Sequence, residues 1–273
     1  NGTILMILVT CTMASFSAQK GAHNLAAAQT TDPDETPGLP QERILISVSN
    51  EETVEELVNL SLAIKSKNNS HHLYALNVMD NQTNDEHKLK KSRKLLENAA
   101  LTAAATDTNI QELLRYDLNV PNAILSVILE HQISDLILGL HKENGISNSF
   151  LGRITEDILS HSDATTLIYK SVQPISTMKR HLVVIPEKAE KEAGFTQWVA
   201  RIGNMLQNTG SKGIFYGSHA TIECLKVLLT KLSTEPEYIE FTDWEDFLIV
   251  FRDIKKDDNL WIIFSRRNQL SFH

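Results

Sequence analysis

Two glycines and two cationic side chains mark the stretch of this chain best suited to bind an anion. Gly139 ends an apolar run that begins at Asp135, a polar loop containing Lys142 follows, and Gly152 and Arg153 lie in the first turn of a helical pattern. A strand that leads through a loop into a helix directs backbone N–H groups and the positive end of the helix dipole toward one point. The spacing predicts an anion site between Gly139 and Arg153, with a plain glycine turn as the alternative.

No arrangement of residues predicts catalysis. Ser-His-Asp, Cys-His and paired-carboxylate patterns do not stand out along the chain. His71 and His72 are adjacent, but neighbouring residues of a strand point to opposite faces. No cysteine or carboxylate stands at ligand spacing from them. We therefore expect no catalytic residues, no metal site and a function other than that of an enzyme.

The composition limits the classes of partner. The chain has 273 residues, 42% of them hydrophobic and 22% charged, which allows one large folded domain or two small ones. Its formal net charge of -8 argues against nonspecific nucleic-acid binding. Only Cys11 and Cys224 occur, far apart, so we expect no disulfide framework and a reducing compartment.

Strand and helix patterns alternate over 43–170, and these elements must position the anion site. Short apolar runs predict five strands, at 44–48, 73–78, 110–116, 135–139 and 165–169. Helical spacing predicts helices at 51–67, 83–106, 121–130 and 150–160. Such alternation is typical of a parallel sheet with right-handed crossovers. The segment is therefore expected to be one complete doubly wound α/β unit.

The pattern restarts after a linker at 171–178. Strands are predicted at 182–185, 213–216, 238–241 and 260–264, and helices at 194–207, 220–232 and 244–254. A complete second copy would continue to another helix and a fifth strand, so 179–273 is predicted to be a truncated second doubly wound unit. A sheet without its fifth strand has an open edge, which predicts self-association as a homodimer.

The N-terminal residues are more apolar than is usual for the start of a soluble domain. Thr3 to Phe16 carry no charge, yet this run is shorter than the about 20 apolar residues that a membrane span needs. No basic segment precedes it, as a signal peptide would require. We expect 1–25 to be the end of a transmembrane helix from a longer chain, and 26–42 to be a linker. A short apolar helix packed within a soluble protein is the alternative.

A cationic cluster lies in the predicted helix at 83–106. Five lysine and arginine residues occur between Lys88 and Lys94. They could contact anionic lipid headgroups, but Glu86 and Glu97 dilute the charge. The favoured interpretation is a solvated helix face.

The order of elements, with its glycine-bounded loop after the fourth strand, resembles the universal stress protein fold, well over 43–170 and loosely over 179–273. Nucleotide-binding members carry G-x2-G-x9-G-[ST] at this loop. Gly139 and Gly152 match the first and last glycines, whereas Lys142 replaces the middle glycine and Arg153 replaces the Ser/Thr. The resemblance implies an adenine nucleotide such as ATP or AMP, with phosphates near these four residues.

The resemblance also implies a place for the adenosine. Family members usually have an aspartate at the end of the first strand, where this chain has Ser49 and Asn50. Val48 in the same segment and Val78 in the second strand complete the candidate binding residues.

The N-terminal apolar segment resembles the end of the last membrane helix in the monovalent cation:proton antiporter-2 family. That resemblance implies a regulatory cytoplasmic tail at the inner membrane, which senses an adenine nucleotide and biases transport. A soluble nucleotide-binding stress protein is the second hypothesis. An enzyme that uses the same fold for adenylate chemistry is the third.

Overall fold

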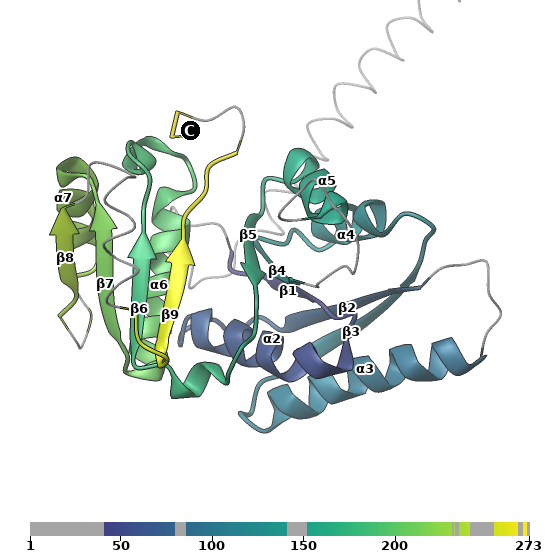
Figure 1. The fold of residues 1–273 in the computed structure, drawn as a ribbon. Coiled ribbons are helices and arrows are strands. Elements are labelled where there is room, and N and C mark those ends of the chain that lie inside the picture. The colour runs from purple at the N-terminus through teal and green to yellow at the C-terminus, as the bar shows by residue number, and fades with distance from the viewer. Residues whose placement is uncertain are drawn as a thin grey trace, which may run out of the picture. The chain divides into compact units, whose positions relative to one another are not determined.

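The computed structural model describes residues 41–79, 86–140, 152–230, 232, 235–240, 254–266 and 270–271. All of them belong to one compact unit, Gln41–His273. The described strands form two parallel sheets, one of five strands and one of four (Figure 1). This confirms the predicted fold class of two parallel-sheet α/β units. The predicted N-terminal apolar helix lies outside the described residues.

The first sheet contains β1 (Ile44–Ser47), β2 (Leu73–Met79), β3 (Ile110–Tyr116), β4 (Asp135–Gly139) and β5 (Thr165–Tyr169). Its strand order is β3-β2-β1-β4-β5, and every pairing is parallel. The chain therefore runs outward from β1 to β3, crosses back, and continues on the other side with β4. The reversal between β1 and β4 makes this sheet doubly wound.

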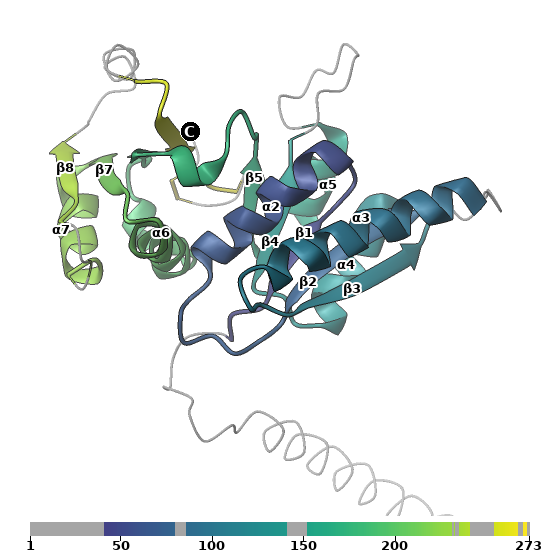
Figure 2. The same ribbon diagram turned by 90° about the horizontal axis from the view of Figure 1, so that it is seen from below.

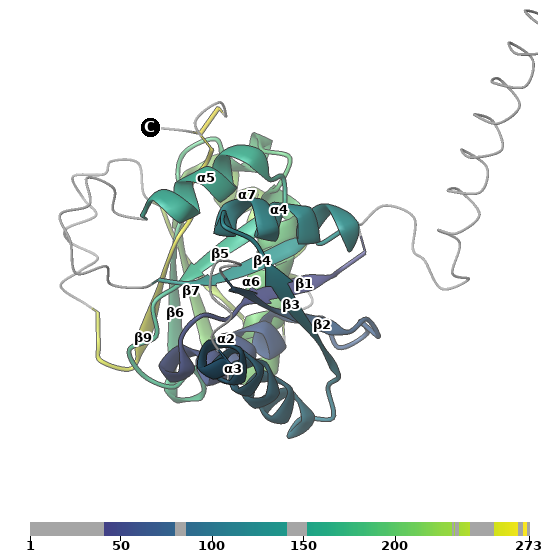
Figure 3. The same ribbon diagram turned by 90° about the vertical axis from the view of Figure 1, so that its right-hand side faces the viewer.

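Four helices cover the two faces of the first sheet. They are α2 (Glu51–Ile64), α3 (Glu86–Ala104), α4 (Val120–Glu130) and α5 (Arg153–His161). Figures 2 and 3 show α2 and α3 on one face, and α4 and α5 on the other. An apolar core lies on each face of this sheet, and successive residues of β1 point to opposite faces. Ile44 and Ile46 pack with α2 and α3, whereas Leu45 packs with α4 and α5.

The second sheet contains β6 (Arg180–Val184), β7 (Lys212–Gly217), β8 (Glu237–Glu240) and β9 (Asp258–Ile262). Its order, β8-β7-β6-β9, repeats the order of the first four strands of the first sheet. Helices α6 (Phe195–Thr209) and α7 (His219–Leu228) pack on one face through a shared apolar cluster, and two short 3-10 turns, η1 (Ile175–Thr177) and η2 (Ala189–Lys191), complete the described elements. The predicted helix at 244–254 lies almost wholly outside the described residues.

Two predicted element boundaries are wrong for identifiable reasons. Helix α5 begins at Arg153, and Gly152 is its N-cap residue with φ 79° and ψ 152°, so Gly152 is not in the first helical turn. Strand β9 begins two residues before the predicted run, at Asp258, and ends at Ile262. The prediction missed Asp258 because its charge is compensated by Arg180, whose Nε donates to it at 2.8 Å.

One face of α6 is polar and is used for contacts with the first α/β unit. Gln197, Arg201, Asn204 and Asn208 recur at helical spacing along this face. The amide of Asn204 donates to the carbonyl of Ile64 at 3.0 Å, and the amide of Asn208 donates to the carbonyls of Ala63 and Lys65, each at 2.9 Å. These carbonyls end α2, where a helix lacks internal donors. The second unit therefore caps a helix of the first.

Arg201 forms the buried centre of this contact. Its Nε and Nη2 each donate to the carboxylate of Asp135 at 2.7 Å, and its Nη1 lies 2.8 Å from the carboxylate of Glu42. The side chain of Asp135 is only 1% exposed. Burial alone would lower the pKa of Arg201, but the hydrogen bonds and charges of Asp135 and Glu42 outweigh burial and raise the pKa. The guanidinium is therefore charged at every physiological pH.

His181 is a second buried polar group, located in β6. The indole N–H of Trp261 donates to its Nδ1 at 3.0 Å, so the ring proton of the neutral form belongs on Nε2. No atom of the described residues accepts a hydrogen bond from Nε2, and the side chain is fully buried. Burial lowers the pKa of His181 to about 4.

We expect Arg201→Met to destabilise the fold by about 3–5 kcal/mol, because it leaves buried carboxylates without a counter-charge. Lys212→Met is the control, since it removes an exposed ion pair with Glu237 and should cost less than about 1 kcal/mol. Urea unfolding of the two variants measures the difference. Equal losses of stability would show that the Arg201 cluster contributes no more than a surface pair.

We also expect the free energy of unfolding to fall as the pH is lowered from about 6.5 to about 4. In this range His181 is protonated in the unfolded state but stays neutral in the folded state. The loss should reach about 3 kcal/mol, since one pKa unit corresponds to about 1.4 kcal/mol. His181→Asn keeps an acceptor for Trp261 but cannot titrate. The unfolding free energy of this variant should depend less on pH than that of the wild type over this range. Parallel pH profiles of the two proteins would show that the pKa of His181 is not lowered in the folded state.

Candidate functional site

The carboxyl ends of β1 and β4 meet where the strand order of the first sheet reverses. Ligands of open α/β sheets bind in the crevice outside such a switch point. Val48, Ser49 and Asn50 follow β1, while Gly139 ends β4. Val48 is buried, Asn50 and Gly139 are half-buried, and Ser49 is exposed. The fold therefore brings these four predicted residues to one edge of the sheet.

Two of these residues have structural functions that the sequence did not reveal. The Oδ1 of Asn50 accepts a hydrogen bond from the backbone N–H of Glu52 at 3.1 Å, which caps α2. Gly139 faces α2 closely, because a Cβ atom there would lie 3.3 Å from Cδ1 of Leu57. The glycine at the end of β4 thus permits close packing of α2, whether or not a ligand is bound.

Asn77 in β2 is a buried polar residue that the sequence analysis missed. Its Nδ2 donates to the backbone carbonyl of Val48 at 2.6 Å and joins the carboxyl ends of β2 and β1. The adjacent Val78, a predicted site residue, is half-buried and packs with the core under α4. An asparagine within the otherwise apolar run of β2 was the available signal. It holds the turn after β1 in place.

The start of α5 is the best anion-binding element on this edge. Gly152 makes no side-chain cap, and Arg153 is exposed. The first N–H groups of a helix lack internal acceptors and lie at the positive end of its dipole. The backbone of Gly152, at positive φ, has a conformation that only glycine adopts without strain. Lys142 lies outside the described residues, so its predicted role stays a prediction.

The start of α2, by contrast, is occupied by its own acidic side chains. Glu51 and Glu52 lie in its first turn, and Nζ of Lys94 lies 2.6 Å from the carboxylate of Glu51. Carboxylates at a helix N-terminus interact favourably with the dipole and repel a further anion. Helix α5 also has an acidic residue in its first turn, Glu156, but it begins with the cation Arg153 and its N-cap residue is a glycine. Of the two helices that begin at this edge next to the switch point, α5 is therefore better suited to a phosphate.

The second sheet has carboxylates at the equivalent edge. Glu192 accepts hydrogen bonds from the backbone N–H and the hydroxyl of Ser271, both at 2.8 Å, and Glu190 accepts one from the hydroxyl of Thr221 at 2.8 Å. When β6 and β9 are aligned with β1 and β4 by their pairing register, Ile263 takes the place of Gly139. Among the described residues at this edge, the donors of Ser271 and Thr221 thus already bind internal carboxylates.

Among the described residues, no cluster of three His, Cys, Asp or Glu side chains is arranged to hold a metal ion. The described helices also include none with the length and apolar content required to span a bilayer.

Comparison with known proteins identifies the first α/β unit. Residues 42–170 match the universal stress protein family. This segment is a universal stress protein domain. No curated protein sequence matches the chain. A universal stress protein from Archaeoglobus fulgidus DSM 4304 is 15% identical, with a TM-score of 0.53, and the alignment covers 78% of this chain and 83% of that chain.

Two further solved structures resemble the universal stress protein domain more loosely. UspA from Lactobacillus plantarum is 17% identical with a TM-score of 0.36, over 48% of this chain and 99% of that chain. A universal stress protein from Archaeoglobus fulgidus, solved in complex with dAMP, is 12% identical with a TM-score of 0.39, over 48% of this chain and 98% of that chain.

We expect one anionic ligand to bind per chain, because the second sheet has Glu190, Glu192 and Ile263 at the edge where the universal stress protein domain has Gly139 and the start of α5. Isothermal titration calorimetry with ATP should give a stoichiometry of one. Two equivalent sites per chain would contradict this prediction and show that the internal carboxylates are displaced.

Proposed function

We propose that the universal stress protein domain senses an adenine nucleotide, such as ATP or AMP. The single observation that carries the proposal is the N-terminus of α5, whose N-cap residue Gly152 has positive φ and no side chain and whose first residue is the exposed Arg153, on the carboxyl edge of a doubly wound sheet. Backbone N–H groups there suit a phosphate. The dAMP complex of the archaeal protein indicates which ligand class to test first.

The proposed binding mode gives each site residue one task. The phosphates lie at the start of α5, against the backbone of Gly139 and Gly152 and beside Arg153 and Lys142. The adenosine lies over the carboxyl ends of the neighbouring strands, near Val48, Ser49, Asn50 and Val78. The hydrogen bond from Asn77 to the carbonyl of Val48 keeps that surface preorganised before the ligand arrives.

We further propose that the chain is the regulatory cytoplasmic part of a cation:proton antiporter at the inner membrane. The support is the uncharged run Thr3–Phe16, one linker ahead of two α/β units. The proposal requires that the same reading frame encode further apolar spans upstream. A soluble nucleotide-binding protein is the competing function, and a reading frame that encodes no such spans would favour it.

Calorimetry with ATP, AMP and cyclic AMP tests the nucleotide site. Arg153→Glu should weaken binding about tenfold or more, because it replaces a favourable charge by a repulsive one. Gly152→Val should abolish binding by blocking the approach of the phosphate to the backbone.

Gly210→Val is the matched control for Gly152→Val. Gly210 also has positive φ, and a Cβ atom at either glycine meets nothing within 4 Å. Gly210→Val therefore introduces backbone strain away from the site, although less than Gly152→Val, because φ 66° and ψ 14° at Gly210 is the left-handed helical region whereas φ 79° and ψ 152° at Gly152 is essentially restricted to glycine. If the wild type gives no heat with any nucleotide, or if both glycine variants lose binding equally, the proposed site is refuted.

A further inference from the structure

The outward face of α3 carries an exposed group of cations. Lys90, Lys91, Arg93 and Lys94 are all exposed, whereas Ser92, Leu95 and Leu96 of the same turns are buried against the sheet. The helix therefore directs four positive charges to solvent within two turns. We call this group the α3 cationic face.

Carboxylates compensate this face only in part: Glu86 and Glu97 lie in the same helix, and Glu112 lies beside Arg93. Lys94 pairs with Glu51, but among the described residues no ion pair joins Lys90, Lys91 or Arg93 to an acidic side chain. Three pairs of cations on this face are three or four positions apart. Each such pair destabilises a helix by about 0.2–0.5 kcal/mol. Glu86, four positions before Lys90, and Glu97, four positions after Arg93, offset part of this repulsion, but the segment keeps an excess of positive charge.

The α3 cationic face begins at the carboxyl edge of the first sheet, because α3 follows β2 directly in the fold. The contact of Lys94 with Glu51 ties it to the start of α2 at the same edge. The chain as a whole carries a formal net charge of -8. The positive charge is therefore a local feature of one surface.

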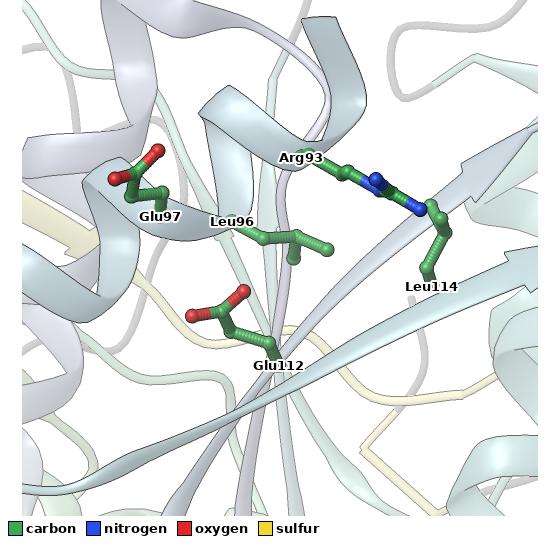
Figure 4. A pocket seen from close by; sticks show the side chains of 5 residues that line it. All are labelled: Arg93, Leu96, Glu97, Glu112 and Leu114. Atoms are coloured by element: carbon green, nitrogen blue, oxygen red, sulfur yellow. The ribbon is translucent and has the colours of Figure 1, made fainter. Parts of the chain in front are cut away.

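The surroundings of the face indicate the kind of partner. Beside it, a hollow of about 500 Å³ between α3 and β3 is lined by Arg93, Leu96, Glu97, Glu112 and Leu114. Figure 4 shows the guanidinium of Arg93 extended toward Leu114, with the carboxylates of Glu97 and Glu112 in the other half of the hollow. These carboxylates make the hollow unsuitable for an anionic ligand, which leaves the exposed lysines of the α3 cationic face as the candidate binding surface.

We propose that the α3 cationic face binds the headgroups of anionic phospholipids. The face carries no aromatic side chain on which a nucleobase could stack, which disfavours single-stranded nucleic acid. The apolar side of α3 is buried in the core, so the contact is electrostatic and requires no insertion of the helix. A headgroup layer needs only such a convex, charged surface.

The strength of the contact follows from the number of charges. Each Lys or Arg near an anionic bilayer strengthens binding about fivefold, and the effect weakens as salt screens it. Lys90→Glu combined with Lys91→Glu should therefore weaken binding by about 25-fold or more. Neither Lys90 nor Lys91 is a residue of the proposed nucleotide site, and the test is made without nucleotide.

Flotation of the full chain with lipid vesicles tests the proposal. The wild type should bind vesicles of phosphatidylglycerol mixed with phosphatidylcholine more strongly than vesicles of phosphatidylcholine alone, and added salt should reduce the difference. The double variant should lose this preference. Lys255→Glu combined with Lys256→Glu makes the same charge change at exposed positions elsewhere and should keep it. Any affinity of Thr3–Phe16 for lipid is common to all three proteins and to both vesicle types.

Two results would overturn the proposal. The wild type could bind both vesicle types equally, or both double variants could lose the preference to the same extent. Retention on heparin that depends on Lys90 and Lys91, without a preference for anionic vesicles, would instead assign the face to a soluble polyanion. Circular dichroism of the variants checks that they are folded.

Discussion

The structure depends on one buried cation shared by three segments. Arg201 of α6 binds Glu42, which precedes β1, and Asp135, which begins β4. These two strands are neighbours whose opposite ends form the candidate site. The cluster therefore fixes, at the amino edge of the sheet, the two strands that shape the crevice at the carboxyl edge. Separating Arg201 from Asp135 would leave a buried charge without a partner, which is very unfavourable. The same ion pair therefore also holds the two α/β units together.

The sequence predicted the alternation of elements because most strands are short apolar runs and most helices have a single buried face. The prediction failed for residues whose conformation depends on partners far away in the sequence. Asp258 and Asn259 have the composition of a loop, but both have partners in β6: Nε of Arg180 donates to Asp258, and the amide nitrogen of Asn259 lies 3.3 Å from Nδ1 of His181. Gly152 fitted a helical pattern, and only its positive φ excludes it from α5.

The candidate site was predictable in position but not in the function of each residue. Parallel topology alone places Val48, Ser49, Asn50 and Gly139 at one edge. That Asn50 caps α2, and that Gly139 permits the approach of Leu57, depends on packing that no linear motif encodes. The carboxylates that fill the second sheet's edge were missed because Glu192 and its partner Ser271 are 79 residues apart.

The capping of α2 by α6 also has a consequence for synthesis on the ribosome. The carbonyl of Ile64 receives its donor from Asn204, 140 residues later in the chain. While the first unit emerges, the last turn of α2 must rely on water for its hydrogen bonds, and Asp135 has no guanidinium beside it. Native packing of the first unit can thus be completed only after α6 has left the exit tunnel. The order of translation therefore places the contacts of α6 with Ile64 and Asp135 among the last that the first unit acquires.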